Sequence, residues 1–126
     1  MLTQERLVAF VWTADPPRAR AFYEGKLGLT FAGDHDHLMT FDSGAARIAL
    51  VKGNQPVTPP PGTAVGWNVG DLRAAVRDLM ARGIVFERVE GMQQDQLQIW
   101  SPVPGEGVAW FKDPDDNRLS LNGPLL

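Results

Sequence analysis

Few side chains in this sequence have the types and spacing needed for chemistry. Both histidines fall in one stretch, Asp34-His-Asp-His37, where carboxylates and imidazoles alternate as they could around a divalent ion. A hairpin turn led by Gly33 is also the usual home of Asp and His, so we interpret the stretch as a turn. The acidic run Asp113 to Asp116 lacks EF-hand spacing and is also interpreted as a turn.

Other reactive groups are missing from the sequence. It contains no cysteine, no Gly-rich phosphate loop and no Ser-His-Asp set. Thiolate nucleophiles and thiolate metal ligands are therefore excluded, and His-based acid–base catalysis has little to work with.

The composition is that of a globular domain. The 126 residues are 44% hydrophobic and 21% charged, which predicts one compact domain. The formal charge is -3 and the basic residues are scattered, so nucleic acid is not expected as a partner. No stretch approaches the roughly 20 apolar residues of a membrane span. The first residues lack the basic start and the apolar run of a signal peptide. We expect no membrane association and a cytoplasmic location.

The elements that must position the functional side chains occur twice. A strand from Leu7 to Trp12 leads into a helix of about residues 16–27, with Asp15 as its N-cap. A second strand, Ala64 to Val69, leads into a second helix capped by Asp71, which follows Asp15 by 56 positions. This self-similarity indicates an internal duplication.

Three strands are expected after each helix, so each half is predicted to be a β-α-β-β-β module. Module one covers about residues 5–53, a Pro-rich linker about 54–62, and module two about 63–123 of a single 1–126 domain. The strands are expected at Thr30–Ala32, Leu38–Phe41 and Arg47–Lys52, then at Val85–Val89, Leu97–Trp100 and Val108–Phe111 or Arg118–Leu121.

Two motifs carry a resemblance to a known family. The stretch from Asp15 to Gly28 resembles the first capped helix of the vicinal oxygen chelate superfamily, the glyoxalase, bleomycin-resistance and dioxygenase group. The stretch from Asp113 to Leu121 is similar to the Asp-Pro-Asp-Gly-Asn turn and closing strand of that family. The resemblance implies an α+β fold in which paired βαβββ modules form a cupped mixed sheet, and it implies a homodimer.

The resemblance also implies where metal-using members place their ligands, one on each of four strands. Carried over, these positions fall on Val8, Ala64 and Ser120, with Arg47 as the polar candidate on the remaining strand. None is an ordinary transition-metal ligand, so we expect no metal and no cofactor. The departure puts metal-dependent glyoxalase, dioxygenase and transferase chemistry in doubt.

Strand alternation predicts which side chains line the cup instead. Phe10 and Trp12 should share the inward face with position 8, while Leu7, Ala9 and Val11 face the helix. Arg47 could pair with a carboxylate or phosphonate of a ligand, or be a solvated salt-bridge partner. The tryptophans could instead fill the core, which is the interpretation preferred for Trp67. The candidate ligand-binding residues are Phe10, Trp12, Arg47, Asn68, Trp100, Trp110 and Ser120.

These features predict a metal-independent protein of bleomycin-resistance type that binds or sequesters a hydrophobic or aromatic, and in one version anionic, ligand. The alternative is a glyoxalase-like lyase, isomerase or dioxygenase with a non-standard metal site or a carboxylate such as Glu87, Asp95 or Glu106. A third class is a dimeric scaffold without a ligand. The sequence does not decide whether the protein is an enzyme.

Overall fold

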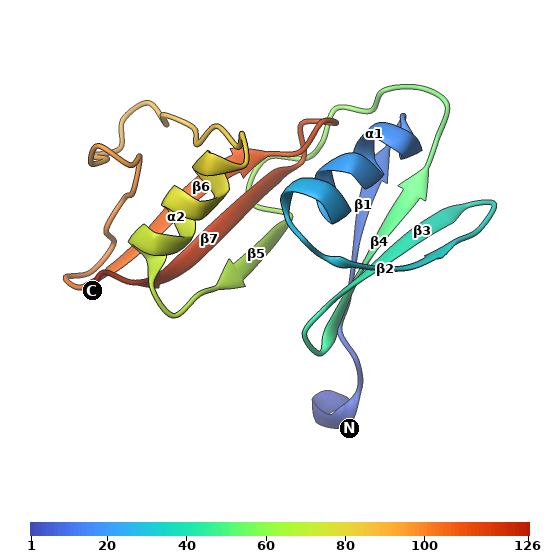
Figure 1. Cartoon of the computed structure of the whole chain (residues 1–126), viewed down its shortest axis with the longest axis horizontal. Helices are drawn as coiled ribbons and strands as arrows, with labels where there is room; N and C mark the ends of the chain where they lie inside the picture. The colour runs from blue at the N-terminus through green and yellow to red at the C-terminus, as the bar shows by residue number, and fades with distance from the viewer. The chain divides into compact units, whose positions relative to one another are not determined.

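A computed structural model describes all residues, 1–126, and shows an α+β protein with mixed sheets and few helices. The chain divides into two compact units (Figure 1). The first unit consists of Met1–Pro60 together with Pro114–Asn117, and the second of Pro61–Asp113 together with Arg118–Leu126. No helix in either unit is long and apolar enough to cross a bilayer.

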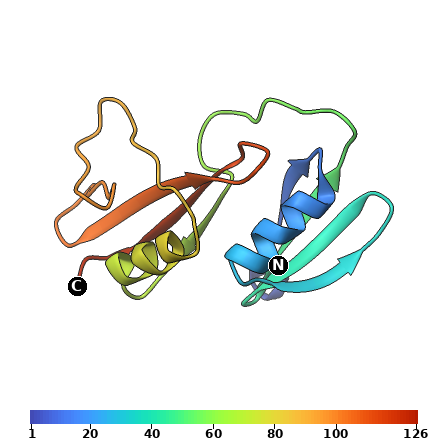
Figure 2. The ribbon, with the colours of Figure 1, turned by 45° about the horizontal axis from the view of Figure 1, so that its top comes forward.

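The first unit is a four-stranded sheet with one helix. The strand order is β1-β4-β3-β2, with β1 parallel to β4 and the other neighbours antiparallel. The helix lies along one face of this sheet (Figure 2). The strands are β1 (Val8–Thr13), β2 (Thr30–Asp34), β3 (Leu38–Ser43) and β4 (Ala46–Lys52).

The first helix forms where its caps predict it. α1 (Pro16–Arg20) continues without a break as a π-helical segment, Ala21–Lys26. The Asp15 side chain accepts a hydrogen bond from the Arg18 amide at 3.1 Å, and Gly28 follows with φ 72°. A capping carboxylate satisfies an amide that the helix leaves free, and glycine takes a left-handed φ without steric cost. The predicted helix of about 16–27 is confirmed.

The helix packs on a core of large apolar side chains. Tyr23, Phe41 and Leu50 are fully buried, and Val11 faces the same layer. Leu7 does not join them: it precedes β1 and is 72% exposed, so its predicted burial against the helix is wrong. Its carbonyl still accepts a hydrogen bond from the Arg47 amide at 2.8 Å, so its side chain is exposed because it lies at the end of the sheet, beyond the buried core.

The second unit has a three-stranded sheet with the order β5-β7-β6 and one long helix. β5 runs parallel to β7, and β6 runs antiparallel to it. Asp71 caps the helix, accepting a hydrogen bond from the Ala74 amide at 3.2 Å. The elements are β5 (Val65–Asn68), α2 (Leu72–Ala81), β6 (Glu106–Lys112) and β7 (Arg118–Pro124).

Two strands expected in the second half do not form. Val85–Val89 and Leu97–Trp100 are irregular, and only Trp100 makes isolated bridges, to Gln94 and Val108. The Gln94 side chain supplies the hydrogen bonds that a strand would have made. It accepts from the Val89 amide at 2.6 Å and donates to the carbonyls of Glu87 and Gln98, each at 2.8 Å.

Candidate functional site

Each sheet has a helix-free face, the face opposite its helix, and the strand register shows which side chains share it. In the first unit, Val8 pairs with Arg47, and Arg47 pairs with Asp42. Paired residues on neighbouring strands point to the same side of a sheet. The next two rows of this face are Phe10–Ala49–Thr40 and Trp12–Val51–Leu38.

Phe10 is the most open apolar side chain of this face. It is 65% exposed, whereas Ala49 and Thr40, its neighbours across the strands, are both buried. An exposed aromatic ring therefore lies beside small buried side chains. The alternation of inward and outward side chains along β1 predicts that Phe10 lies on this face.

Trp12 shares this face but is half-buried and already has partners. Its indole N–H donates to the Gln55 carbonyl at 3.2 Å. A Cβ added at Gly53 would overlap the indole ring, so the ring lies against bare backbone at that point. The start of the segment after β4 therefore holds Trp12 in place, and its N–H is not free for a ligand.

Arg47 also has a partner. Its Nε donates to Asp42 Oδ1 at 2.9 Å, and the same carboxylate oxygen pairs with Arg6. The hydrogen bond from Arg47 lowers the pKa of Asp42 below its usual range; burial opposes this, and the charges of Arg47 and Arg6 reinforce it. Arg47 therefore has a partner within the chain, but Arg47 and Arg6 share this one carboxylate, so the three groups together keep a positive charge.

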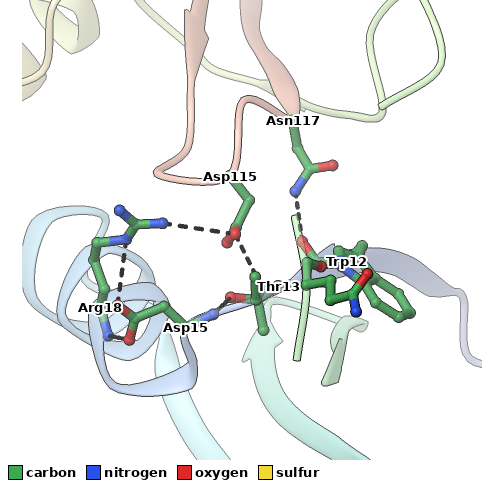
Figure 3. Close-up of polar contacts among 8 residues, drawn as sticks. Trp12, Thr13, Asp15, Arg18, Asp115 and Asn117 are labelled. Atoms are coloured by element: carbon green, nitrogen blue, oxygen red, sulfur yellow. Dashed lines mark hydrogen bonds and ion pairs between the residues drawn. The ribbon is translucent and has the colours of Figure 1, made fainter. Parts of the chain in front are cut away.

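The connection from β1 to α1 is tied to residues 114–117, which belong to the first unit (Figure 3). Asp115 accepts a hydrogen bond from the Ala14 amide at 3.0 Å and lies 3.7 Å from an Arg18 guanidinium nitrogen. Asn117 donates to the Trp12 carbonyl at 2.9 Å. The backbone on either side of Thr13 is thus fixed by the Asp113–Asn117 turn.

The helix-free face of the second unit carries a pair of tryptophans. Trp110 pairs with Ser120 on β7, and Ser120 with Gly66 on β5. Trp100 bridges Val108, so it lies on the same side as Trp110. The two indole rings are stacked with centroids 6.0 Å apart and planes inclined by 26°. Trp67 lies on the other side and stacks on buried Phe111 at 6.5 Å, but it is itself half-buried.

A row of neutral polar side chains lies beside the tryptophans. Ser120 Oγ donates to Asn122 Oδ1 at 3.0 Å, and Asn122 Nδ2 lies 3.5 Å from Asn68 Oδ1. Gly66 permits this row, since a Cβ there would lie 2.6 Å from Ser120 Oγ. Ser120 is only 3% exposed, so it orients Asn122, while Asn68 is exposed.

The carboxylates considered for an enzyme have structural partners or lie in solvent. Glu87 pairs with Arg118 at 3.2 Å, leaving Glu87 Oε1 and Arg118 Nε buried without partners. Asp95 accepts hydrogen bonds from the amides of Leu97 and Ile99, which is turn chemistry. Glu106 is exposed.

The residues at the family's metal positions do not fit a metal ion. Val8 and Ala64 have no donor atom, and Arg47 is a paired cation. Ser120 has its hydroxyl engaged by Asn122. In neither unit do three His, Asp or Glu side chains form a group that could hold a metal. In the turn, Asp34 pairs with Lys52 instead.

Comparison with known proteins assigns the family. The family model described as Glyoxalase/Bleomycin resistance protein/Dioxygenase superfamily matches residues 6–121. The chain belongs to this superfamily. The resemblance carried by the Asp15–Gly28 and Asp113–Leu121 motifs is thereby confirmed. No curated protein matches.

Solved structures of glyoxalase-family proteins share the fold. A putative glyoxalase family protein from Bacillus anthracis is 16% identical, with a TM-score of 0.74 over 96% of this chain and 95% of that one. A protein titled glyoxalase/bleomycin resistance protein/dioxygenase, from Alicyclobacillus acidocaldarius, is 19% identical, with a TM-score of 0.68 over 96% and 92%. A protein titled lactoylglutathione lyase, from Agrobacterium tumefaciens, is 16% identical, with a TM-score of 0.66 over 98% and 96%. At these identities the glyoxalase likeness is one of fold.

The structure places the seven candidate residues on two helix-free faces. Phe10, Trp12 and Arg47 lie on that of the first unit, and Asn68, Trp100, Trp110 and Ser120 on that of the second. Sequence reasoning missed Asp42 and Asn122. Asn122 could have been found, because alternation along β7 places it beside Ser120.

Proposed function

We propose that the chain is a metal-independent small-molecule-binding protein of bleomycin-resistance type, which sequesters a flat hydrophobic or aromatic ligand on a helix-free face. The observation that carries this proposal is the stacked Trp100–Trp110 pair on a face that no helix covers. Indole rings provide large apolar area of fixed shape, and their stacking geometry suits another flat ring.

In the first unit, exposed Phe10 makes the helix-free face apolar as well. Arg47 is the residue expected to pair with an anionic group, but its guanidinium is already engaged by Asp42, which it shares with Arg6. An anionic ligand would have to displace Asp42 to reach Arg47. An uncharged aromatic ligand is therefore better supported than an anionic one.

The test is a thermal-shift screen of aromatic compounds on protein pretreated with EDTA. A binder at 100 times its Kd stabilises the folded state by about 2.7 kcal/mol, which raises Tm by roughly 10 °C for a chain of this size. Each binder is recovered and checked by mass spectrometry. Recovery of the unchanged compound supports sequestration.

Two outcomes overturn the proposal. Conversion of the compound, or binding that requires an added divalent ion, would establish the enzyme alternative. The absence of any shift across neutral, cationic and anionic aromatic compounds would favour a scaffold without a ligand.

The proposal includes a homodimer and a cytoplasmic location, both expected from the sequence. Exposed Phe10 and the outer edge of β1, which ends its sheet, support an interface between copies. Light scattering at increasing protein concentration tests the dimer, and Phe10→Ser should weaken it if that face is involved.

A further inference from the structure

The open polar groups beside the Trp100–Trp110 pair are donors, and this determines the chemistry of a ligand that would fit there. Neither indole N–H has an acceptor within the chain, in contrast to Trp12, whose N–H is bound to Gln55. Neither indole nitrogen is among the buried atoms without partners, so both N–H groups are open to solvent.

The amide row adds a third donor. The Asn122 oxygen is taken by Ser120, and the Asn122 nitrogen is directed at the Trp67 carbonyl and the Asn68 oxygen. What remains free at the exposed end of the row is the Asn68 NH₂ group, which carries two donor hydrogens. Ser120 and the Glu87 Oε1 atom are buried, and the exposed carboxylate of Glu106 lies one row beyond Val108, at the start of β6.

Exposed Lys112 and Glu106 lie at opposite ends of β6, one row beyond Trp110 and one row beyond Val108, so no charge lies between them on the central part of this face. Arg118 lies on it, two and four residues before Ser120 and Asn122 on β7, but its guanidinium pairs with Glu87. A ligand anion at the Asn68 end of the face would meet no unpaired cation there, because Lys112 lies two rows from Asn68. A neutral acceptor such as a carbonyl oxygen meets free N–H donors without displacing a partner.

The strand spacing sets the size of the ligand. Asn68 on β5 and Trp110 on β6 are separated by β7, and two strand spacings amount to about 10 Å. Two or three fused rings with a carbonyl at one end cover that distance.

We infer that the helix-free face of the second unit binds an uncharged, planar, fused-ring ligand that packs against Trp100–Trp110 and offers a carbonyl oxygen to the Asn68 amide. This deepens the proposed function and rests on it, because it names the class of compound and the face that selects it.

Three probes of matched shape test the inference: 2-acetylnaphthalene, 2-ethylnaphthalene and 2-naphthoate. Asn68→Ala should weaken 2-acetylnaphthalene about threefold to tenfold, the effect of one hydrogen bond, and leave 2-ethylnaphthalene unchanged. Trp110→Ala should weaken both neutral probes. The control Asn54→Ala, an exposed Asn of the first unit, should change neither.

Nitrogen-15 NMR of the four indole N–H groups locates the ligand directly. The Trp100 and Trp110 signals should shift when 2-acetylnaphthalene is added, while that of Trp12 stays in place. Single Trp→Phe variants assign the signals.

The inference is overturned if 2-acetylnaphthalene binds with equal affinity to wild type and Asn68→Ala, or if only the Trp12 signal moves. It is also overturned if 2-naphthoate is the tightest probe and its affinity is lost in Arg47→Gln. Each of these results leaves ligand binding itself intact. Failure of every probe to bind, by contrast, counts against the proposed function as well.

Discussion

Arg47 and Asp42 face each other across β4 and β3 and are joined by a hydrogen bond of 2.9 Å from Arg47 Nε to Asp42 Oδ1. This pair occupies the row of the helix-free face that also contains Val8. Val8 and Arg47 stand at two of the positions to which the family resemblance assigns metal ligands, and this row contains an ion pair. The strength of the Arg47–Asp42 pair should be measurable from the pH dependence of the unfolding free energy and from ligand affinity.

The pH dependence follows from the lowered pKa of Asp42, caused first by the Arg47 hydrogen bond. A carboxylate with a depressed folded-state pKa stabilises the fold above its unfolded pKa of about 3.9 and loses that contribution as pH falls through the folded value. Asp42→Asn should therefore lower the free energy of unfolding at pH 7 and match wild type in strong acid. Urea unfolding across this range measures it. A difference that persists unchanged in strong acid would contradict the assignment, and Arg47→Gln should reproduce most of the effect.

Removing Asp42 should also release Arg47. In Asp42→Asn we expect 2-naphthoate to bind about threefold to tenfold more tightly than in wild type, since a freed guanidinium can donate to the carboxylate. Isothermal titration measures the change. The double variant Asp42→Asn with Arg47→Gln is the control and should lose the gain; an unchanged affinity in Asp42→Asn would remove Arg47 from the candidate ligand-binding residues.

Gly53 should be intolerant of a side chain. A Cβ there would overlap the Trp12 ring, so Gly53→Ala should cost about 1–3 kcal/mol of unfolding free energy and move the Trp12 indole signal. Gly25→Ala is the matched control, because no atom lies within 4 Å of its added Cβ and the position is helical. That variant should be neutral or stabilising by up to about 1 kcal/mol. Equal stabilities of the two variants would show that Trp12 is not held against Gly53.

Asn117 should contribute more to the free energy of unfolding than its position in a turn suggests. It is buried and donates to the Trp12 carbonyl, so Asn117→Ala leaves an acceptor without its partner and should cost about 1–3 kcal/mol. Asp116 next to it has φ 66°, and Asp116→Gly should be neutral or stabilising by up to about 1 kcal/mol. Chemical unfolding of both variants separates the hydrogen bond from general disturbance of the turn.

Gln94 should be essential for order in the irregular segment. Gln94→Ala removes three side-chain hydrogen bonds to the backbone, and the amide of Val89 should exchange with solvent at least tenfold faster. Exposed Gln96, two residues away, provides the control: Gln96→Ala should leave the exchange of Val89 unchanged. Unaltered exchange in Gln94→Ala would mean that packing alone orders the segment.

Local signals in the sequence predicted much of this fold. The capping aspartates and the left-handed glycines mark both helices, and alternation assigned Phe10, Trp110 and Asn68 to the helix-free faces. These features depend on residues close in sequence or on a strict period of two, so they can be inferred without coordinates.

Two kinds of feature could not be inferred from the sequence. One depends on the register between strands, and the other on a side chain that makes hydrogen bonds in place of a strand backbone. The Arg47–Asp42 pair requires knowing how β3 aligns with β4. The apolar residues of the irregular segment fit the pattern of strands. A hydropathy pattern does not show that the Gln94 side chain supplies the backbone hydrogen bonds in their place. The side of Trp100 became clear only from its bridge to Val108.

The turn at Pro114–Asn117 shows that the first unit is not one continuous stretch of sequence. These four residues follow most of the second unit in the sequence, yet they belong to the first unit, where they satisfy the Ala14 amide and the Trp12 carbonyl. A gene fragment covering residues 1–60 would lack them. The first unit therefore cannot be cut out as a single stretch of the chain without losing two of its backbone hydrogen bonds.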